Sequence, residues 1–234
     1  MNFKKFWKTL NSLYEKLLIF LLIIVLLIVL YCMYDAWYLY NHTLDGSILK
    51  YKPNEYSADA EDSPITEDMK AWITIDGTNI DYPVMQGNDN IKYLNTDPFG
   101  EYSLSGSIFL DSRSAPDFTD LYSLIYGHHM EYGKMFGALD DFLNRAYLES
   151  HAYGTLIIGR NAEKTYSLEV FACMETNAAE EIAFTPGNSA EISQYIKSNA
   201  KIYKAERSER IIGLSTCAEG DSINRIIVFC YILE

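Results

Sequence analysis

The sequence has little cysteine and lacks the residue spacings that mark common metal sites. Its 234 residues include only four cysteines: Cys32, Cys173, Cys217 and Cys230. This number is too small for the disulfide framework of a compact secreted scaffold. No Cys-x-x-Cys or His-Glu-x-x-His spacing occurs, and the adjacent His128 and His129 cannot easily bind one tetrahedral zinc ion. We therefore expect no metal site and no cofactor.

Basic residues are also scarce, and they are unevenly distributed. The net charge is −13, yet residues 1–34 carry +3 from four lysines and Glu15, so the remaining residues carry −16. Such an acidic surface argues against nucleic acid or anionic lipid as a partner of this larger part. The sequence also shows no internal repeat, no low-complexity tract and no second boundary between globular domains.

Residues 17–34 form a long apolar run without a single charged side chain. At about 1.5 Å per helical residue, this run crosses most of a bilayer core of about 30 Å. A cleaved signal peptide is the alternative, but its apolar region is shorter and is followed by small residues. Lysines precede the run and Asp35 follows it, so the positive-inside rule places the N-terminus in the cytoplasm. We expect a single-pass type II protein of the cell membrane.

The sequence after this run predicts one β-rich domain with a few helices. We expect a cytoplasmic tail (1–16), a transmembrane helix (17–34), juxtamembrane helices and a linker (35–68), and an extracytoplasmic domain (69–234). Alternating side chains around an Asp-Gly turn predict a β-hairpin over residues 71–86. Further strands are predicted over residues 107–111, 123–126, 153–159 and 165–174, and helices over residues 89–95, 134–143 and 191–203.

The predicted helix over residues 191–203 is the clearest amphipathic segment. It places Ile192, Ile196, Ala200 and Tyr203 on one face. Packing against the domain is the ordinary role of such a face, and a lid or partner surface is the alternative.

A thiol and a guanidinium stand on either side of a short polar loop near the C-terminus. A β-type segment ends at Cys217, the loop contains the turn signal Gly220-Asp221, and a second β-type segment begins at Arg225. Neighbouring strands joined in this way place the two side chains next to each other, and a nearby cation favours the thiolate. The alternative is a buried cysteine near a surface arginine.

A nucleophilic cysteine needs a group that takes its proton, and histidine is the usual choice at neutral pH. His42 lies beside the apolar run and His151 lies in a polar turn. His128 and His129 directly follow a predicted strand, and Gly127 lets the backbone turn there. This pair therefore provides the better candidates for an imidazole at the end of a strand.

Several motifs follow one another along the chain: Asp89-Asn90-x-x-Tyr93-Leu94, Gly106-Ser107-Ile108-Phe109-Leu110-Asp111, Tyr126-Gly127-His128, Leu214-Ser215-Thr216-Cys217 and Arg225. Together they resemble class B sortases, the membrane-anchored cysteine transpeptidases of Gram-positive bacteria. They follow the order of the family over roughly residues 72–234, and the apolar run before them suits its type II topology.

The resemblance implies a mainly β fold with a few helices: an eight-stranded sortase-type β-barrel preceded by one transmembrane helix. It also implies a transpeptidase that cleaves an Asn-Pro-x-Thr-like motif through a thioester and transfers the acyl group to a peptidoglycan amine. Its partners are then secreted proteins with a C-terminal sorting signal, a peptidoglycan precursor or cross-bridge amine, and the membrane. Nucleic acid is not an expected partner.

The resemblance assigns roles to three side chains in particular. Cys217 matches the nucleophile, Arg225 matches the donor that stabilises the oxyanion or positions substrate, and His128 matches the general acid and base. His128 is selected over its neighbour because the family's imidazole directly follows the glycine. The positions that line the family's substrate groove are matched here by Asn90, Leu94, Tyr126 and Ser215. Their alternative interpretations are a helix-end polar group, two core residues and a strand-edge hydroxyl, in that order.

Other functions remain open at this level. The chain could polymerise pilins with a lysine acceptor, hydrolyse its acyl-enzyme as a cysteine peptidase, or serve as an inactive β-domain that acts as an adhesin or membrane tether. Cys230 lies five residues beyond Arg225, an odd step along one strand, so we expect it to face away from the site and pack in the core. We expect a structural role for Cys173 as well.

Overall fold

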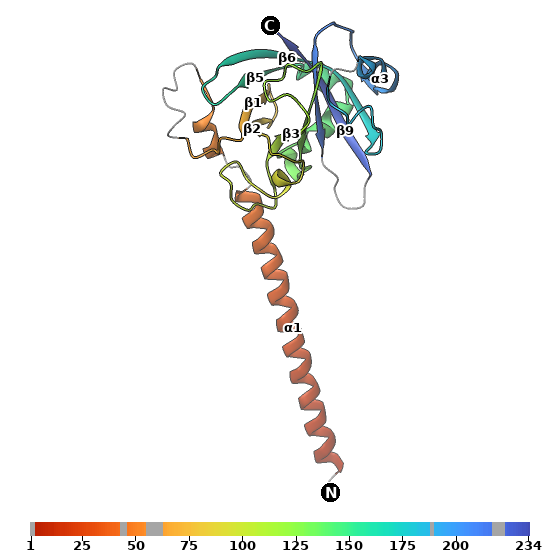
Figure 1. Cartoon of the computed structure of the whole chain (residues 1–234). Helices are drawn as coiled ribbons and strands as arrows, with labels where there is room; N and C mark the ends of the chain where they lie inside the picture. The colour runs from red at the N-terminus through yellow and green to blue at the C-terminus, as the bar shows by residue number, and fades with distance from the viewer. Residues whose placement is uncertain (1–2, 43–45, 55–62, 188–189, 217–222) are drawn as a thin grey trace. The chain divides into compact units, whose positions relative to one another are not determined.

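The computed structural model describes residues 3–42, 46–54, 63–187, 190–216 and 223–234. Its helical elements are α1 (Phe3–His42), η1 (Gly46–Tyr51), η3 (Lys92–Leu94), η4 (Glu131–Gly133), η5 (Gly137–Leu143), α2 (Arg145–Ser150) and α3 (Glu191–Asn199). Its strands are β1 (Met69–Ile75), β2 (Asp81–Met85), β3 (Ile108–Leu110), β4 (Tyr122–Gly127), β5 (Tyr153–Ile158), β6 (Lys164–Asn177), β7 (Ile202–Tyr203), β8 (Arg210–Thr216) and β9 (Asn224–Leu233). The chain divides into two compact units, Met1–Asp45 and Gly46–Glu234 (Figure 1).

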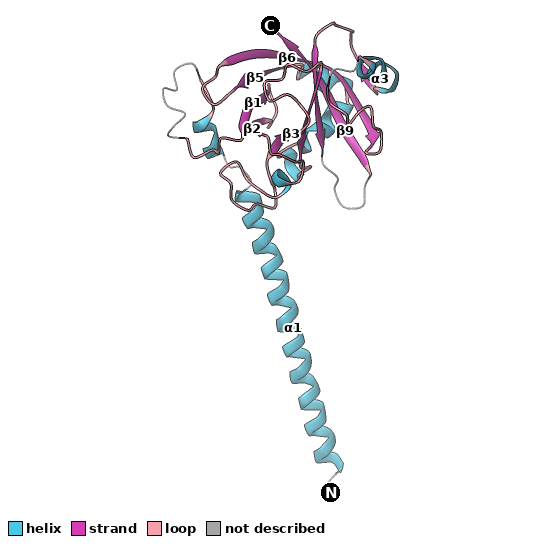
Figure 2. Ribbon diagram, in the orientation of Figure 1, coloured by secondary structure: helices cyan, strands magenta, loops and turns pink. Residues whose placement is uncertain are grey.

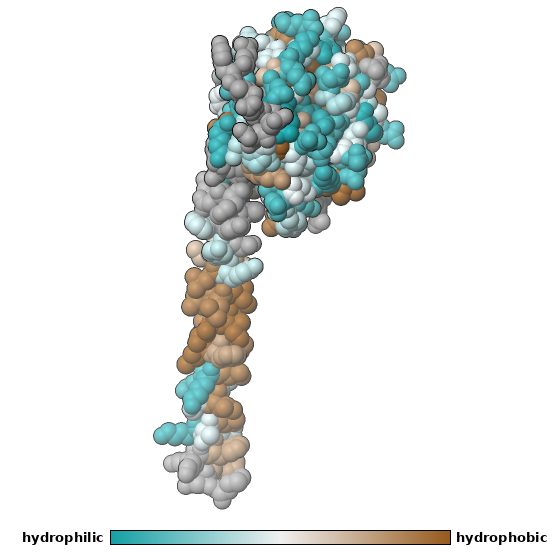
Figure 3. Space-filling view, turned by 60° about the vertical axis from the view of Figure 1, so that its left-hand side comes forward, coloured by the Kyte–Doolittle hydropathy of each residue, from teal (hydrophilic) through white to brown (hydrophobic). Residues whose placement is uncertain are grey.

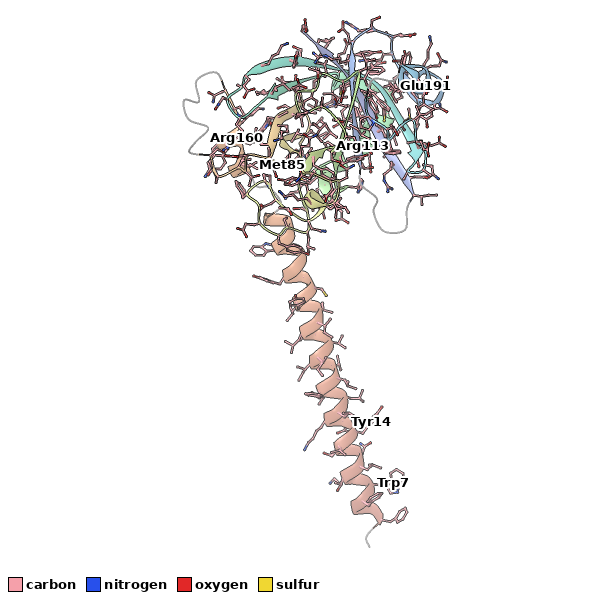
Figure 4. All side chains as sticks on the ribbon, viewed as in Figure 1. Trp7, Tyr14, Met85, Arg113, Arg160 and Glu191 are labelled. Carbon is pink, nitrogen blue, oxygen red and sulfur yellow. The ribbon has the colours of Figure 1, made fainter. Side chains whose placement is uncertain are left out.

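The first unit contains α1, whose segment Phe6–Tyr34 holds a window of 18 residues that is apolar on all sides. This window has a mean hydropathy of 3.2, and none of it is buried. Apolar side chains cover the middle of this helix in Figure 3, and the labelled Trp7 and Tyr14 project outward from it in Figure 4. A helix that is hydrophobic on all sides requires an apolar surrounding. The structure therefore contains a candidate membrane span, longer than the predicted residues 17–34.

The second unit is an eight-stranded closed β-barrel, as expected (Figure 2). The hydrogen-bonded order is β5-β1-β2-β3-β4-β8-β9-β6, and β6 pairs back with β5 to close the ring. The short β7 pairs with β6 at Ala172 and Cys173. Closure removes the free sheet edges on which other chains could add a strand. The pairs β2–β3 and β4–β8 are parallel, and the remaining neighbours are antiparallel.

The first two strands form the predicted hairpin. They join through Asp76 and Gly77, and Gly77 has a φ of +75°, a left-handed conformation that favours glycine. The backbone N–H of Ile75 donates to the carbonyl of Ile80 at 2.9 Å, which closes the turn. The hairpin was predictable from the sequence because the alternating side chains and the turn residues both indicate it.

Strands β8 and β9 read as nearly continuous apolar runs because both of their faces are covered. Nearly every residue of β8 and most residues of β9 are buried. Ile192 and Ile196 of α3 pack in one cluster with Phe229 of β9 and Phe171 of β6. The predicted face of α3 is therefore a packing face, the ordinary role for such a stripe.

The predicted helix over residues 191–203 is too long at its C-terminal end. Helix α3 ends at Asn199, because Ala200 adopts an extended conformation with ψ of 134°. Ile202 then belongs to β7, where it pairs with Cys173 of β6 and is 4% exposed. The apolar side chains of residues 202 and 203 continue the helical spacing by coincidence, and strand pairing decides their structure.

Two helical segments near the middle of the chain also differ from expectation. The predicted helix over residues 134–143 is a 3₁₀ helix, η5, and α2 follows it without having been predicted. The side chain of Asn144 accepts hydrogen bonds from the backbone N–H groups of Ala146 and Tyr147 at 2.9 and 3.4 Å. Asparagine at such a position is a helix-start signal, so the sequence did contain a cue for α2.

Candidate active site

Strands β4 and β8 lie side by side and end together. They run parallel, and their last paired residues are Gly127 and Thr216. The next residue after β4 is His128, and the next residue after β8 is Cys217, which lies outside the described residues. Two predicted catalytic positions, almost ninety residues apart in sequence, therefore follow directly from neighbouring strand ends.

The start of β9 completes this rim. Ser215 of β8 pairs with Ile227 of β9, and the backbone N–H of Ile226 donates to Oγ1 of Thr216 at 3.2 Å. This hydrogen bond joins the ends of β8 and β9, and Thr216 is almost fully buried there. Arg225 immediately precedes Ile226, so the third predicted catalytic residue begins at the same rim.

His128 is half-buried and bonds to the backbone of the segment after β2. Its Nε2 lies 2.8 Å from the carbonyl oxygen of Leu94. A carbonyl oxygen can only accept a hydrogen bond, so Nε2 carries a proton and Nδ1 is the acceptor of the neutral ring. The neighbouring His129 instead has its Nε2 2.8 Å from Oδ2 of Asp140 in η5. The two imidazoles are thus held by different segments.

Arg225 is half-buried at the start of β9. One of its guanidinium nitrogens, Nη1, donates to the carbonyl of Asn224 at 3.1 Å. The side chain of Asn224 donates to Oε1 of Glu175 in β6 at 2.9 Å, which fixes this end of β9 against β6. A guanidinium is permanently charged and has five N–H donors, so it can direct several of them at developing negative charge.

The described thiols of the barrel are unsuited to nucleophilic attack. Cys173 and Cys230 are both fully buried. Burial raises the pKa of each thiol to about 12. Both therefore stay protonated at neutral pH, and the thiolate is the reactive form. The predicted core packing of Cys230 is confirmed by its burial.

A buried carboxylate with several charged and polar partners lies at the end of β3. Asp111 is fully buried, and its carboxylate accepts two bonds from the Arg113 guanidinium at 2.9 and 2.7 Å. It also accepts from Nδ2 of Asn90 at 2.9 Å and from the hydroxyl of Tyr126 at 3.1 Å. Arg113 in turn donates to the carbonyl of Phe184 at 2.6 Å. We call Asp111, Arg113, Asn90 and Tyr126 the Asp111 cluster; Arg113 is labelled in Figure 4.

Opposing effects act on the pKa of Asp111. Burial raises it, whereas the hydrogen bonds and positive charge of Arg113, together with the hydroxyl of Tyr126, lower it. The lowering effects are larger, so the pKa lies below the ordinary value for aspartate. The carboxylate is therefore ionised at neutral pH and forms an ion pair in which the Asp111 side chain is buried and the Arg113 side chain is 53% exposed.

Two of the four predicted substrate residues belong to this cluster. Asn90 uses both ends of its amide there, because its Oδ1 accepts from the backbone N–H of Ser112 at 2.8 Å while its Nδ2 bonds to Asp111. The ring of Tyr126 lies 5.4 Å from that of Phe109, measured between centroids. The geometry gives both side chains a definite structural task.

The other two predicted substrate residues lie nearer to the strand ends. Leu94 is half-buried, and its carbonyl is the partner of His128. Ser215 is fully buried in β8, with its Oγ donating to the carbonyl of Thr216 at 3.2 Å. The structure thus brings Leu94 to His128 and places Ser215 below the rim formed by β4, β8 and β9.

Sequence reasoning assigned no role to Asp111 or Arg113. The available signal was an aspartate directly after the apolar strand Ile108–Leu110, followed two residues later by an arginine. An ionisable residue that ends a buried strand needs a partner, since a lone buried charge is costly. Across the part of the chain that the structure describes, three or more His, Cys, Asp or Glu side chains nowhere gather as a metal site.

Comparison with protein families gives a match to the sortase domain over residues 73–233. The chain is 31% identical to "Sortase B" of Staphylococcus aureus over 179 residues, which cover 73% of this chain and 72% of that protein. It is 34% identical to "Sortase B" of Listeria monocytogenes over 160 residues, which cover 65% of this chain and 64% of that protein.

Solved structures give the same result for the fold. A Streptococcus pyogenes class B sortase involved in pilus biogenesis is 38% identical, with a TM-score of 0.65, and the match covers 70% of this chain and 92% of that one. The Staphylococcus aureus sortase B structure gives a TM-score of 0.66 at 28% identity and covers 73% and 83%. A Staphylococcus aureus sortase B–substrate complex gives 0.68 at 26% identity and covers 81% and 89%.

Proposed function

The chain belongs to the sortase family, and from this premise we propose that it is a membrane-anchored cysteine transpeptidase of class B. Its substrates are secreted proteins with a C-terminal sorting motif of the Asn-Pro-x-Thr kind. Its acceptor is an amine of a peptidoglycan precursor or cross-bridge. Helix α1 crosses the cell membrane once, with the N-terminus in the cytoplasm, so that the domain of residues 69–234 acts outside the cell.

The observation that carries this proposal is the register between β4 and β8. The pairing of Gly127 with Thr216 supports a position for Cys217 directly beside His128, one residue beyond the last described pair. The antiparallel register of β8 and β9 similarly supports a position for Arg225 opposite Cys217. These three residue types at one rim supply a nucleophile, a proton carrier and a donor for negative charge.

The proposed reaction proceeds in two acyl transfers. The Cys217 thiolate attacks the carbonyl carbon of the motif's threonine, and the oxyanion that forms accepts hydrogen bonds from Arg225. As the bond to the next residue breaks, the departing amine takes a proton from the His128 imidazolium, which leaves a thioester on Cys217. The acceptor amine then attacks the thioester and gives its proton to His128. The carbon–sulfur bond of the resulting intermediate then breaks, which restores the Cys217 thiolate and leaves a new amide.

The test uses the full-length protein in detergent, an Asn-Pro-x-Thr peptide and a stem peptide that carries a free amine. We expect mass spectrometry to find the cleaved peptide and the amide-linked product with the wild type. Cys217→Ala abolishes both products, and His128→Ala and Arg225→Ala lower them by about 10²-fold or more. Retention of cleavage in Cys217→Ala would exclude a thioester on this residue.

Pilin polymerisation is the second candidate, and one comparison favours it. The Streptococcus pyogenes class B sortase with 38% identity is involved in pilus biogenesis. The two candidates differ only in the acceptor, so the same assay separates them when a lysine peptide with a blocked N-terminus replaces the stem peptide. A product joined through the lysine side chain, with none on the stem peptide, supports pilin polymerisation.

A non-catalytic β-domain predicts a different chemical behaviour for Cys217. A thiolate that depends on its neighbours loses reactivity when they are removed. We therefore expect a thiol-reactive probe to label Cys217 of the wild type faster than Cys217 of His128→Ala or Arg225→Ala. Equal labelling rates in all three proteins would favour the domain without catalytic activity.

A further inference from the structure

The Leu94 carbonyl is the group that holds the His128 ring. Its oxygen lies 2.8 Å from Nε2, and it accepts the proton of that nitrogen. In many triads a carboxylate orients the catalytic imidazole, whereas here a main-chain carbonyl takes that position. The orientation of His128 therefore depends on what positions residues 92–94.

The short helix η3 holds this carbonyl from one side. Tyr93 is 1% exposed, and its hydroxyl donates to Oδ2 of Asp68 at 2.7 Å. The carbonyl of Tyr93 accepts from the backbone N–H of Ser107 at 2.9 Å. The N–H of Leu94 donates to the carbonyl of Ile91 at 3.1 Å, so the peptide group that directly precedes the Leu94 carbonyl is bonded at both its C=O and its N–H.

Gly106 approaches the same carbonyl from the other side. It has a φ of +56°, and its N–H closes a turn to the carbonyl of Ser103 at 3.1 Å. A Cβ added to Gly106 would lie 2.5 Å from the Leu94 oxygen and 2.8 Å from the Leu94 carbonyl carbon, and it would also clash with the Tyr93 oxygen. Backbone atoms at such distances must move, since the obstacle is not a flexible side chain.

We propose that Gly106 is a positioning residue for His128, because the absence of a side chain there lets the Leu94 carbonyl stand where it holds Nε2–H. This inference rests on the proposed catalytic role of His128. With Nε2 bonded to Leu94, Nδ1 is the nitrogen that exchanges the proton with the departing amine and the acceptor amine. A displaced Leu94 carbonyl would release the ring and misdirect Nδ1.

The first experiment measures the ring directly, without any catalytic step. The sequence has four histidines, so selective ¹⁵N labelling of the full-length protein in detergent gives few ring signals, and His128→Ala identifies the one of interest. We expect Nε2 of His128 to carry the proton over the whole pH range in which the ring is neutral. A neutral ring with its proton on Nδ1 would overturn the proposal.

The second experiment compares Gly106→Ala with Gly100→Ala. Both glycines have a positive φ, +56° and +88°, so both alanines are strained by the left-handed backbone. The Cβ of Gly100 would meet only Cγ2 of Thr66, at 3.4 Å, and it would approach no part of Leu94. Gly100→Ala therefore also places an alanine at a positive φ but leaves the Leu94 carbonyl in place.

We expect Gly106→Ala to lower kcat/KM for the sorting peptide by about 100-fold, mainly through kcat, because a small misplacement of a catalytic group has this effect. We also expect it to shift the ¹⁵N signals of His128. We expect Gly100→Ala to keep kcat/KM within about twofold of the wild type and to leave the ¹⁵N signals of His128 in place. Equal effects of the two variants, or an unchanged His128 signal in Gly106→Ala, would contradict the proposal.

A milder variant covers the case in which Gly106→Ala does not fold. Tyr93→Phe keeps the buried ring and removes the bond to Asp68, so it loosens the same carbonyl without a clash. We expect it to shift the His128 signals and to lower kcat by a few fold, and no change in either would count against the proposal. Failure of the proposed function is distinct, because it appears as unchanged transfer by Cys217→Ala, whereas the ring signals report the position of His128 regardless.

Discussion

The Asp111 cluster and the rim formed by His128, Thr216 and Arg225 are two polar regions joined by one strand, β4. In the cluster, one fully buried carboxylate accepts bonds from Arg113, and the partners come from three separate segments. At the rim, the two cationic or ionisable side chains are half-buried and bond to main-chain carbonyls. Arg113 of the cluster donates to a carboxylate, and Arg225 of the rim donates to the carbonyl of Asn224.

This difference separates a structural use of charge from a chemical one. A buried charge that is paired and hydrogen-bonded stabilises one arrangement of the chain and has little left to offer a ligand. A guanidinium at the end of a strand has five N–H donors and can direct several of them at a substrate or oxyanion. The cluster would thus form the frame, and the rim would carry the chemistry.

The two arginines give the largest test of this comparison. Arg225→Lys removes the planar set of donors at the rim, and we expect kcat/KM to fall by about 100-fold while the melting temperature changes little. Arg113→Lys loses the two-point contact with Asp111, and we expect a loss of about 1–2 kcal/mol in the free energy of unfolding. Its kcat/KM stays within about threefold of the wild type. Peptide cleavage and urea unfolding of both variants measure these effects.

The opposite result would break the comparison. If Arg113→Lys lost as much activity as Arg225→Lys while remaining stable, the Asp111 cluster would belong to the reacting centre. Matched lysine substitutions are suited to this question because both variants keep the positive charge and change only the geometry of the donors.

Asp111→Asn tests the frame itself through its pH dependence. The folded-state pKa of Asp111 is lowered, so its ionised form stabilises the fold above the unfolded-state pKa of about 3.9, and this stabilisation is lost as the pH falls through the folded-state pKa. We expect the free energy of unfolding of Asp111→Asn to be about 2 kcal/mol lower than that of the wild type at pH 7. This difference between the two proteins becomes smaller in acid, because there the wild-type carboxylate loses its charge as well.

Urea unfolding at pH 7 and at pH 3 measures this gap. A gap that is the same at both values would mean that the carboxylate charge contributes nothing and that only packing is affected. Peptide transfer at pH 7, measured where both proteins are folded, serves as the control for an effect on the rim.

Individual strands of the β-barrel were predictable because their signals are local, whereas the Asp111 cluster was not because its bonds join segments that are distant in sequence. Alternation around Asp76 and Gly77 predicts β1 and β2 within one segment. Asp111, by contrast, looks like the polar end of β3, and nothing near it indicates that Asn90 and Tyr126 converge on it. Such contacts depend on which strands become neighbours.

The candidate rim was predictable from the sequence only in part. The strand ends before His128 and Cys217 follow from local pattern, but the parallel register of β4 and β8 joins segments that have no short connection between them. The resemblance to class B sortases, and no local pattern, predicted that His128 and Cys217 belong to one site. The wrong prediction at residues 202–203 also comes from a distant contact. Their apolar spacing suits a helix, but they form a strand because they pair with β6.

The thiols extend the comparison from charged groups to cysteines. Cys230 is fully buried, and its pKa of about 12 keeps it protonated. We expect Cys230→Ala to lose about 1 kcal/mol of stability through the small cavity it leaves, with kcat/KM within about twofold of the wild type. A charged thiol reagent labels Cys230→Ala like the wild type and labels Cys217→Ala far less. A large loss of activity in Cys230→Ala, with the fold intact, would contradict its assignment to the core.

Tyr126→Phe has the smallest expected effect, and it distinguishes a structural role of the hydroxyl from a substrate-binding role. Tyr126 was predicted to contact substrate and is observed in the Asp111 cluster. The variant removes the hydroxyl that donates to Asp111 at 3.1 Å but keeps the ring beside Phe109. If the hydroxyl serves the frame, the free energy of unfolding falls by about 0.5–1.5 kcal/mol and KM for the sorting peptide stays constant. If it serves the substrate, KM rises and stability is unchanged. We expect the first result, since a hydroxyl whose proton is already committed to a buried carboxylate has none left to donate to a peptide.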